Sequence, residues 1–193
     1  MPKVELYLDE ADRMVRKGDF DEAMMWLGRH LEEHGYSEES KREVSWRIRD
    51  ISERQMERRE FPRAFDYYDS YLGLAKSFLS PEEYRAAVDF AVEKCRWIID
   101  VQTRSNSFDI ACKYFDRILT YGIQLSDTGK YDGILSYIVD KYIEEMKRKV
   151  SDPNVLEKLR QEADKYIGMI TDGKLRHDFI NKKVACDDHT DIY

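Results

Sequence analysis

The chain has 193 residues, of which 42% are hydrophobic and 37% are charged, and its formal net charge is −7. This composition is typical of a helical protein long enough to bury a core. The negative charge disfavours sequence-independent DNA binding, which needs a basic face. The sequence contains no apolar run of the about 18 residues that indicate a membrane span.

The amino-terminal sequence and the cysteines indicate a reducing compartment. Residues 1–5 contain no apolar run and are closely followed by acidic residues, so we expect no signal peptide. Cys95, Cys112 and Cys186 are an odd number and form no CxxC pair, which favours free thiols over a disulfide framework. We therefore expect a cytoplasmic protein that does not enter membranes.

Helix start and stop signals divide the chain into eight helices and a short ninth. No stretch alternates as a strand, so the expected fold class is all-α. Connections of two to six residues make neighbouring helices antiparallel hairpins. We expect the helices at 3–16, from an Asp19 cap to His34, from a Ser37 cap to Arg59, from Phe61, at 81–104, from Ser107 to Ser126, at 131–149, from Asp152 to Thr171, and at 174–185.

Two start signals are especially clear. Ser80-Pro81-Glu82-Glu83 combines a capping serine, a proline at the first helical position and a glutamate that completes a capping box. Asp19 and Glu22 form a second capping box, and Pro62 lies in a first turn where its missing N–H costs nothing.

Three stretches repeat one pattern: Phe, Ala three residues later, a large apolar residue at seven and Leu at eleven. Steps of three, four and four keep these side chains on one helix face, and the recurrence of the same residue types indicates an internal repeat. The copies are Phe20-Ala23-Leu27-Leu31, Phe61-Ala64-Tyr68-Leu72 and Phe108-Ala111-Phe115-Leu119.

With this pattern the chain resembles a tetratricopeptide repeat (TPR) protein, whose signature is W-x2-L-G-x2-Y followed by A-x3-F and P. Ala111-x3-Phe115 matches the second half literally. The first half is weaker, and its small-residue slot holds Ala11, Ser52 and Ile99. We expect each anchor alanine, and Ala64 in particular, to lie where the two helices of a hairpin touch.

The resemblance implies antiparallel hairpins stacked as a short right-handed TPR-like α-solenoid. We expect one repeat domain over residues 1–171, whose last two helices form a degenerate pair, and a capping helix with an acidic tail over residues 172–193. The chain departs from the family because its anchor alanines are 41 and 47 residues apart, against about 34 in the family. The alternative is a non-repeating bundle whose helices share an amphipathic spacing.

In the TPR family the first helix of each hairpin lines a concave groove that holds a peptide or partner helix. Arg49 and Arg96 occupy the same slot in successive copies, where two guanidinium groups can hold an acidic segment. The alternative is two surface arginines paired with neighbouring acids. Trp46 lies off the buried face of its helix, so we expect it to be exposed, either as a binding anchor or as one of the single exposed apolar residues that are common on proteins. The implied groove residues are Leu8, Asp12, Val15, Arg16, Trp46, Arg49, Glu53, Met56, Glu57, Glu93, Arg96, Asp100, Thr103 and Arg104.

Two short patterns resemble metal sites. His30-Leu31-Glu32-Glu33-His34 fits the H-x-x-E-H signature of inverted zinc peptidases, but no third ligand is recognisable and Leu31 belongs to the buried stripe. Cys186-Asp187-Asp188-His189 with Asp191 is a second pattern, which a solvated acidic tail also explains. We expect no metal and no cofactor.

The arginines between residues 42 and 59 interleave with acids, which indicates an ion-paired face and argues against nucleic-acid binding. The function expected from the sequence is a non-enzymatic adaptor or scaffold that binds a protein segment in its groove. The first alternative is a self-associating structural homodimer. A metal-dependent hydrolase using His30 and His34 is the second.

Overall fold

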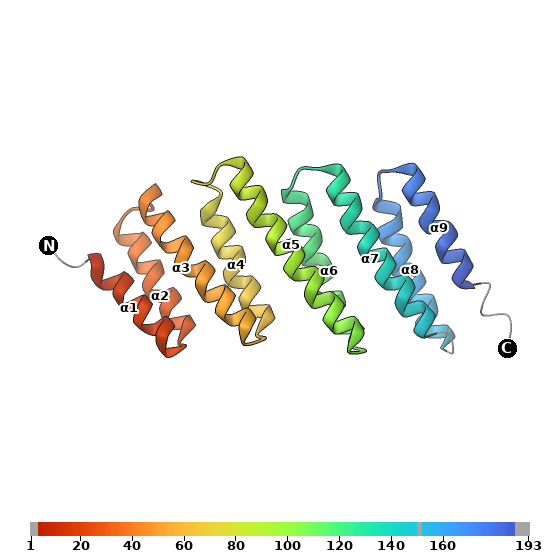
Figure 1. The fold of residues 1–193 in the computed structure, drawn as a ribbon, viewed down its shortest axis with the longest axis horizontal. Coiled ribbons are helices and arrows are strands. Elements are labelled where there is room, and N and C mark those ends of the chain that lie inside the picture. Colours follow the sequence, from red (N-terminus) through yellow and green to blue (C-terminus); the bar gives the residue numbers. More distant parts are fainter. Residues whose placement is uncertain (1–3, 150–151, 188–193) are drawn as a thin grey trace. The chain divides into compact units, whose positions relative to one another are not determined.

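The structure, a computed structural model, describes residues 4–149 and 152–187. Within these ranges it contains helices and no strands, which confirms the all-α class (Figure 1). None of the described helices is long and apolar enough to cross a bilayer. The helices are α1 Val4–Lys17, α2 Phe20–Glu33, α3 Glu38–Glu57, α4 Phe61–Ala75, α5 Pro81–Arg104, α6 Phe108–Gln124, α7 Thr128–Arg148, α8 Pro153–Met169 and α9 Gly173–Asp187.

The chain forms two compact units, Met1–Ala87 and Val88–Tyr193, and the boundary between them falls inside α5. In the first unit α1 packs against α2 and α3 against α4. In the second unit α7 packs against α6 and α8, and α9 packs against both α7 and α8. Short turns join consecutive helices within each unit, so that they run antiparallel (Figure 1).

The turns of three hairpins have the same backbone conformation. Each contains one residue with a left-handed backbone five positions before an anchor alanine: Gly18 with φ 80°, Arg59 with φ 62° and Asn106 with φ 60°. Glycine adopts this conformation without strain and asparagine tolerates it, whereas arginine does so at a cost.

The same three turns share one hydrogen-bond pattern. The N–H of the residue after the left-handed position donates to the carbonyl five residues earlier, as in a Schellman motif. The bonds are Asp19 N to Met14 O at 3.0 Å, Glu60 N to Gln55 O at 3.0 Å and Ser107 N to Gln102 O at 2.8 Å.

The second of these hairpins is closed at its small-residue slot. The Ser52 hydroxyl of α3 donates a hydrogen bond of 2.6 Å to the Ala64 carbonyl of α4. Ser52 and Ala64 are both fully buried, and so are Ala11 and Ala23 in the first hairpin. The prediction that Ala64 lies at the contact between two helices is therefore confirmed.

Most of the predicted start signals cap their helices. Ser80 and Glu83 form a complete capping box, with bonds of 3.2 Å and 2.9 Å. The predicted box at Asp19 is only half formed, because Asp19 accepts from the Glu22 N–H at 3.2 Å but its own N–H donates to the Met14 carbonyl. The predicted start of α7 at Tyr131 is wrong, because Asp127 accepts from the Lys130 N–H at 3.0 Å and the helix begins at Thr128.

The last helix is fastened to the second unit by a buried carboxylate. Asp132 of α7 is 5% exposed and accepts hydrogen bonds from the Thr171 N–H at 3.0 Å, the Thr171 hydroxyl at 2.6 Å and the Asp172 N–H at 2.9 Å. Phe179 of α9 is also buried, as predicted for a docked cap. The second apolar pair of α9, Ile180 and Val184, is 42% and 48% exposed.

Candidate partner-binding surface

The predicted groove residues of the first unit lie on α1 and α3. Leu8 and Met56 are half-buried, and Arg16 and Glu57 are exposed. Val15 is 9% exposed, so its side chain contributes mainly to the core. Asp12 forms two hydrogen bonds with Arg47 of α3, at 2.9 Å and 3.3 Å, and thereby ties the two first helices of this unit together.

An aromatic and cationic cluster marks the surface of α3. Trp46 is 47% exposed, as expected for a residue off the buried face of its helix. The Arg49 guanidinium lies over the Trp46 ring at 5.6 Å and over the Tyr71 ring of α4 at 6.0 Å. Glu53 pairs with Arg49 at 2.9 Å. Trp46, Arg49, Glu53 and Tyr71 are called the α3 cluster below.

The remaining α3 arginines are also ion paired. Their partners lie one turn away on the same helix or, for Arg47, on α1, so this face carries mixed charge. The arrangement is the ion-paired one that the sequence predicted. The pairs are Arg42 with Glu38 at 3.3 Å, Arg47 with Asp12 at 2.9 Å and Arg54 with Asp50 at 2.8 Å.

A second cluster connects α5 and α7 in the other unit. The Tyr137 hydroxyl donates to the Asp100 carboxylate at 2.8 Å and contacts the Arg96 carbonyl at 3.0 Å. Lys141 pairs with Asp100 at 3.0 Å. The Arg96 guanidinium lies over the Tyr137 ring at 5.3 Å and pairs with Glu93 at 3.0 Å. These five residues are called the α5–α7 cluster below.

The surroundings of Tyr137 and Lys141 in the α5–α7 cluster determine their protonation states. Burial raises the pKa of Tyr137, and the Asp100 carboxylate that accepts its hydrogen bond raises it further. Burial acts to lower the pKa of Lys141, but hydrogen bonds to Asp100 and Glu144 outweigh it and raise the pKa above its ordinary value. Tyr137 therefore stays a neutral donor and Lys141 a cation across the physiological range.

The surface beside the α5–α7 cluster is hollow. A cavity of about 330 Å³ lies between α5 and the start of α7, and Arg96 and Glu93 line it. The ion pair between Lys130 and Asp89, 2.6 Å long, also lines it. A Cβ placed on Gly133 would meet no atom within 4 Å, so the glycine leaves the cavity open. The other lining residues are Val92, Leu125 and Ile134.

The last predicted groove residues lie at the end of α5. Thr103 is 3% exposed, and its hydroxyl donates to the Ile99 carbonyl at 2.9 Å, so it presents little surface. Arg104 is exposed and donates to the Asp100 carbonyl at 3.1 Å.

Arg49 and Arg96 belong to different units, and each is paired with an acid on its own helix. This is the arrangement that the alternative interpretation expected. Each guanidinium also lies over a tyrosine ring from another helix, which fixes its position. That both arginines line one concavity remains a prediction.

The histidines of the H-x-x-E-H pattern lie at the end of α2. His30 is 1% exposed, and its ring lies 4.3 Å from that of His34. The His30 Nε2 atom is 3.4 Å from the Glu43 carboxylate. The pKa of His30 lies below its ordinary value of 6.5, chiefly because burial disfavours the charged ring and also because His34 is close, although Glu43 acts in the opposite direction.

In the described part of the chain, no three His, Cys, Asp or Glu side chains are arranged to hold a metal ion. The second metal pattern, from Cys186 to Asp191, lies outside the side chains that the structure describes. Neither of the described cysteines, Cys95 and Cys112, is in a disulfide.

Sequence reasoning missed three residues of these surfaces. Tyr71 was expected in the core, where it does lie, but its ring also supports Arg49. The pairing of Arg47 with Asp12 and that of Tyr137 with Asp100 carried no signal, because the partners are 35 and 37 residues apart.

Comparison with known proteins gave no match to a family model, to a curated protein sequence or to a solved structure.

Proposed function

We propose that this chain is a non-enzymatic cytoplasmic protein-interaction module that binds a peptide or a partner helix through the first helices of its hairpins. We further propose that these hairpins stack as a short right-handed TPR-like α-solenoid. The main support for this function is the α3 cluster, in which Arg49 lies over the ring of the half-exposed Trp46.

The repeat architecture is supported by the equivalence of three hairpins. Their turns have the same left-handed residue and the same backbone hydrogen bond, at positions that match when the anchor alanines are aligned. Turns of this kind are common at helix ends, so the support for a repeat lies in their equal spacing, with the left-handed residue five positions before the anchor alanine in each copy. Neither Cys95 of α5, which is buried, nor Cys112 of α6, which is half-buried, is in a disulfide, and this fits a reducing compartment.

The binding surface is supported by the chemistry of Trp46. Tryptophan and arginine are the residues most enriched at the energetic centres of protein interfaces. The stacking of Arg49 on Trp46 and Tyr71 orders both side chains before a partner arrives, which reduces the entropy lost on binding. The acid Glu53 beside them gives the surface mixed charge, which suits a protein segment better than a polyanion.

The test compares capture by the full-length protein, by Trp46→Ala and by Met25→Ala. Met25 is the control because it is a large apolar side chain, 44% exposed, on α2, which is the second helix of its hairpin and lies outside the α3 cluster. A protein captured from native lysate by the wild type and by Met25→Ala is expected to be lost with Trp46→Ala. With that protein purified, Trp46→Ala should weaken its binding at least about 30-fold, the loss typical of an interface hot spot.

Circular dichroism and thermal melting of both variants establish that they are folded. Equal capture by all three proteins would refute the assignment of the α3 cluster as the binding surface. Capture of the chain itself alone, with a dimeric mass in solution, would replace the adaptor with the self-associating homodimer.

A further inference from the structure

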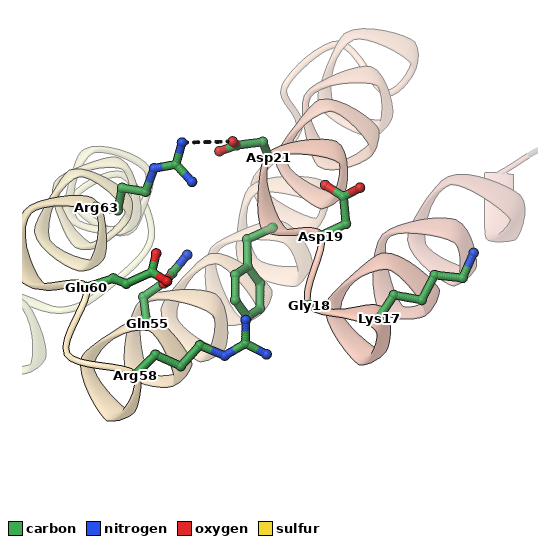
Figure 2. A pocket seen from close by; sticks show the side chains of 9 residues that line it. Lys17, Gly18, Asp19, Asp21, Gln55, Arg58, Glu60 and Arg63 are labelled. Atoms are coloured by element: carbon green, nitrogen blue, oxygen red, sulfur yellow. Dashed lines mark ion pairs between the residues drawn. The ribbon is translucent and has the colours of Figure 1, made fainter.

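The first unit contains a polar pocket of about 300 Å³, between the turn that joins α1 to α2 and the turn that joins α3 to α4 (Figure 2). The turn between α1 and α2 forms one part of its wall, and the end of α3 with the start of α4 forms the other. The lining residues are Lys17, Gly18, Asp19, Phe20, Asp21, Gln55, Arg58, Glu60 and Arg63. None of them belongs to the α3 cluster.

Several charges of this pocket are already neutralised within the unit. Arg63 pairs with Asp21 at 3.2 Å, as Figure 2 shows, and Asp21 also accepts a hydrogen bond of 2.6 Å from the Tyr67 hydroxyl. The Asp19 carboxylate caps α2. Arg63, Asp21 and Asp19 therefore form a fixed wall, and none of them needs a ligand.

Three charges of the pocket, on Lys17, Arg58 and Glu60, have no such partner among the described residues. The Arg58 guanidinium lies over the Phe20 ring at 4.8 Å and makes no ion pair or hydrogen bond with the described residues. Gly18 allows this position, because a Cβ there would lie 2.8 Å from an Arg58 nitrogen. Glu60 is the residue before α4, yet its carboxylate caps no N–H and pairs with no described cation.

Gln55 adds an unsatisfied acceptor between these charges. The side chain is 2% exposed, and its Oε1 atom has no hydrogen-bond partner among the described residues. Buried polar atoms without a partner are uncommon in proteins and indicate a missing donor. Because the two ends of a carboxamide have nearly the same shape, rotation of the amide can bring Oε1 toward a donor in the pocket.

We propose that this pocket binds a small zwitterion of the α-amino-acid class. The ligand carboxylate accepts two hydrogen bonds from the Arg58 guanidinium, whose planar fork matches a carboxylate. The ligand ammonium donates to Gln55 Oε1 and pairs with Glu60. A ligand with no net charge fits the lining, which contains three acids and three bases, whereas a phosphate dianion would be repelled by the acids.

Figure 2 shows that the two side chains proposed to hold the charged ends of the ligand lie in different parts of the pocket. The Arg58 guanidinium extends toward Gly18, whereas the Glu60 carboxylate lies in the part of the view that contains Gln55. The Lys17 side chain extends away from Arg58, so Arg58 is the cation that the carboxylate meets. The ligand side chain extends from the open mouth of the pocket and does not determine recognition.

The test is a binding titration of the full-length protein with free L-amino acids, followed by calorimetry and amide chemical-shift changes. At least one free amino acid is expected to bind saturably. Its N-acetyl derivative, which lacks the ammonium, and its carboxamide, which lacks the carboxylate, should each bind at least about tenfold more weakly, because each loses a charge-assisted contact. Inorganic phosphate is titrated in parallel.

Variants locate the site. Arg58→Met keeps an apolar contact with Phe20 and Glu60→Gln keeps the shape of the side chain, and each should weaken binding at least about tenfold. Arg59→Met is the matched control, because Arg59 is an exposed cation of the same turn that does not line the pocket. It should bind like the wild type.

Three results would overturn the proposal: no binding of any free amino acid, equal binding of the blocked derivatives, or tighter binding of phosphate. Binding that survives in Arg58→Met and Glu60→Gln would place the ligand elsewhere and would also overturn it. Melting of the variants without ligand shows whether they are folded, and an unfolded variant is replaced by Gln55→Leu, for which the same loss is expected.

Discussion

Replacing Ala64 by leucine tests the contact on which the second hairpin depends. Ala64 is fully buried, and its carbonyl is 2.6 Å from the Ser52 hydroxyl of the facing helix. The three additional carbons of leucine have to separate α3 from α4 or adopt a strained rotamer. Overpacking of this kind costs about 1–3 kcal/mol, and moving the helices apart also weakens the Ser52 bond, which contributes about 1 kcal/mol.

The free energy of unfolding of Ala64→Leu, measured by urea titration, should therefore fall by about 1–4 kcal/mol. Ala86→Leu is the control, because Ala86 is exposed on α5 and the substitution makes the same change in helix propensity. The control should change stability by less than about 0.5 kcal/mol. Equal stability of Ala64→Leu and the wild type would show that the hairpin contact is not where the structure places it.

Four further predictions concern other parts of the fold. Arg59→Gly should raise the free energy of unfolding by about 0.5–1 kcal/mol, because glycine removes the strain of the left-handed turn. Asp132→Asn should lower it by about 1–2 kcal/mol at pH 7. Although burial acts to raise the pKa of Asp132, its bonds to the loop before α9 lower it below 3.8, so this difference should shrink as the pH falls below that value. The folded-state pKa of His30 lies below 6.5, so the unfolded chain binds the proton more readily, and the wild type should lose more stability than His30→Gln between pH 7.5 and pH 5.5. Phe179→Ala should release α9 and speed its cleavage by trypsin, whereas Ile180→Ala, at an exposed position, should not.

The helices could be predicted from the sequence because their signals are local. Ser80 and Glu83 cap α5 and are only three residues apart. The spacing of each anchor alanine from the apolar residues around it is enough to identify the buried face of its helix. The start of α7 was misplaced because the sequence after Asp127 contains Thr128 and Gly129, which are typical of a turn as well as of a first helical turn.

The common turn could not be predicted because its three residues differ. Gly18 and Asn106 each favour a left-handed backbone, but Arg59 does not, and only the alignment on the anchor alanines places the three in one position. All three turns nevertheless close with the same local backbone hydrogen bond.

The exposure of Trp46 followed from its angle on α3 relative to the buried residues Val44 and Ile48. Its neighbours could not be predicted in the same way. Tyr71 comes from another helix, and the pairing of Tyr137 with Asp100 joins residues 37 positions apart. The sequence thus indicated which helix faces carry the surface, but not which side chains support one another on it.

The most direct test of partner binding places a photoreactive amino acid on each of two surfaces of the first unit. Glu53 of the α3 cluster and Glu32, exposed near the end of α2, are replaced one at a time in the full chain, which is then irradiated in native lysate. The account predicts an adduct with another protein at position 53 and none at position 32. No adduct at position 53, an equal adduct at both positions, or an adduct only with the chain itself would contradict it.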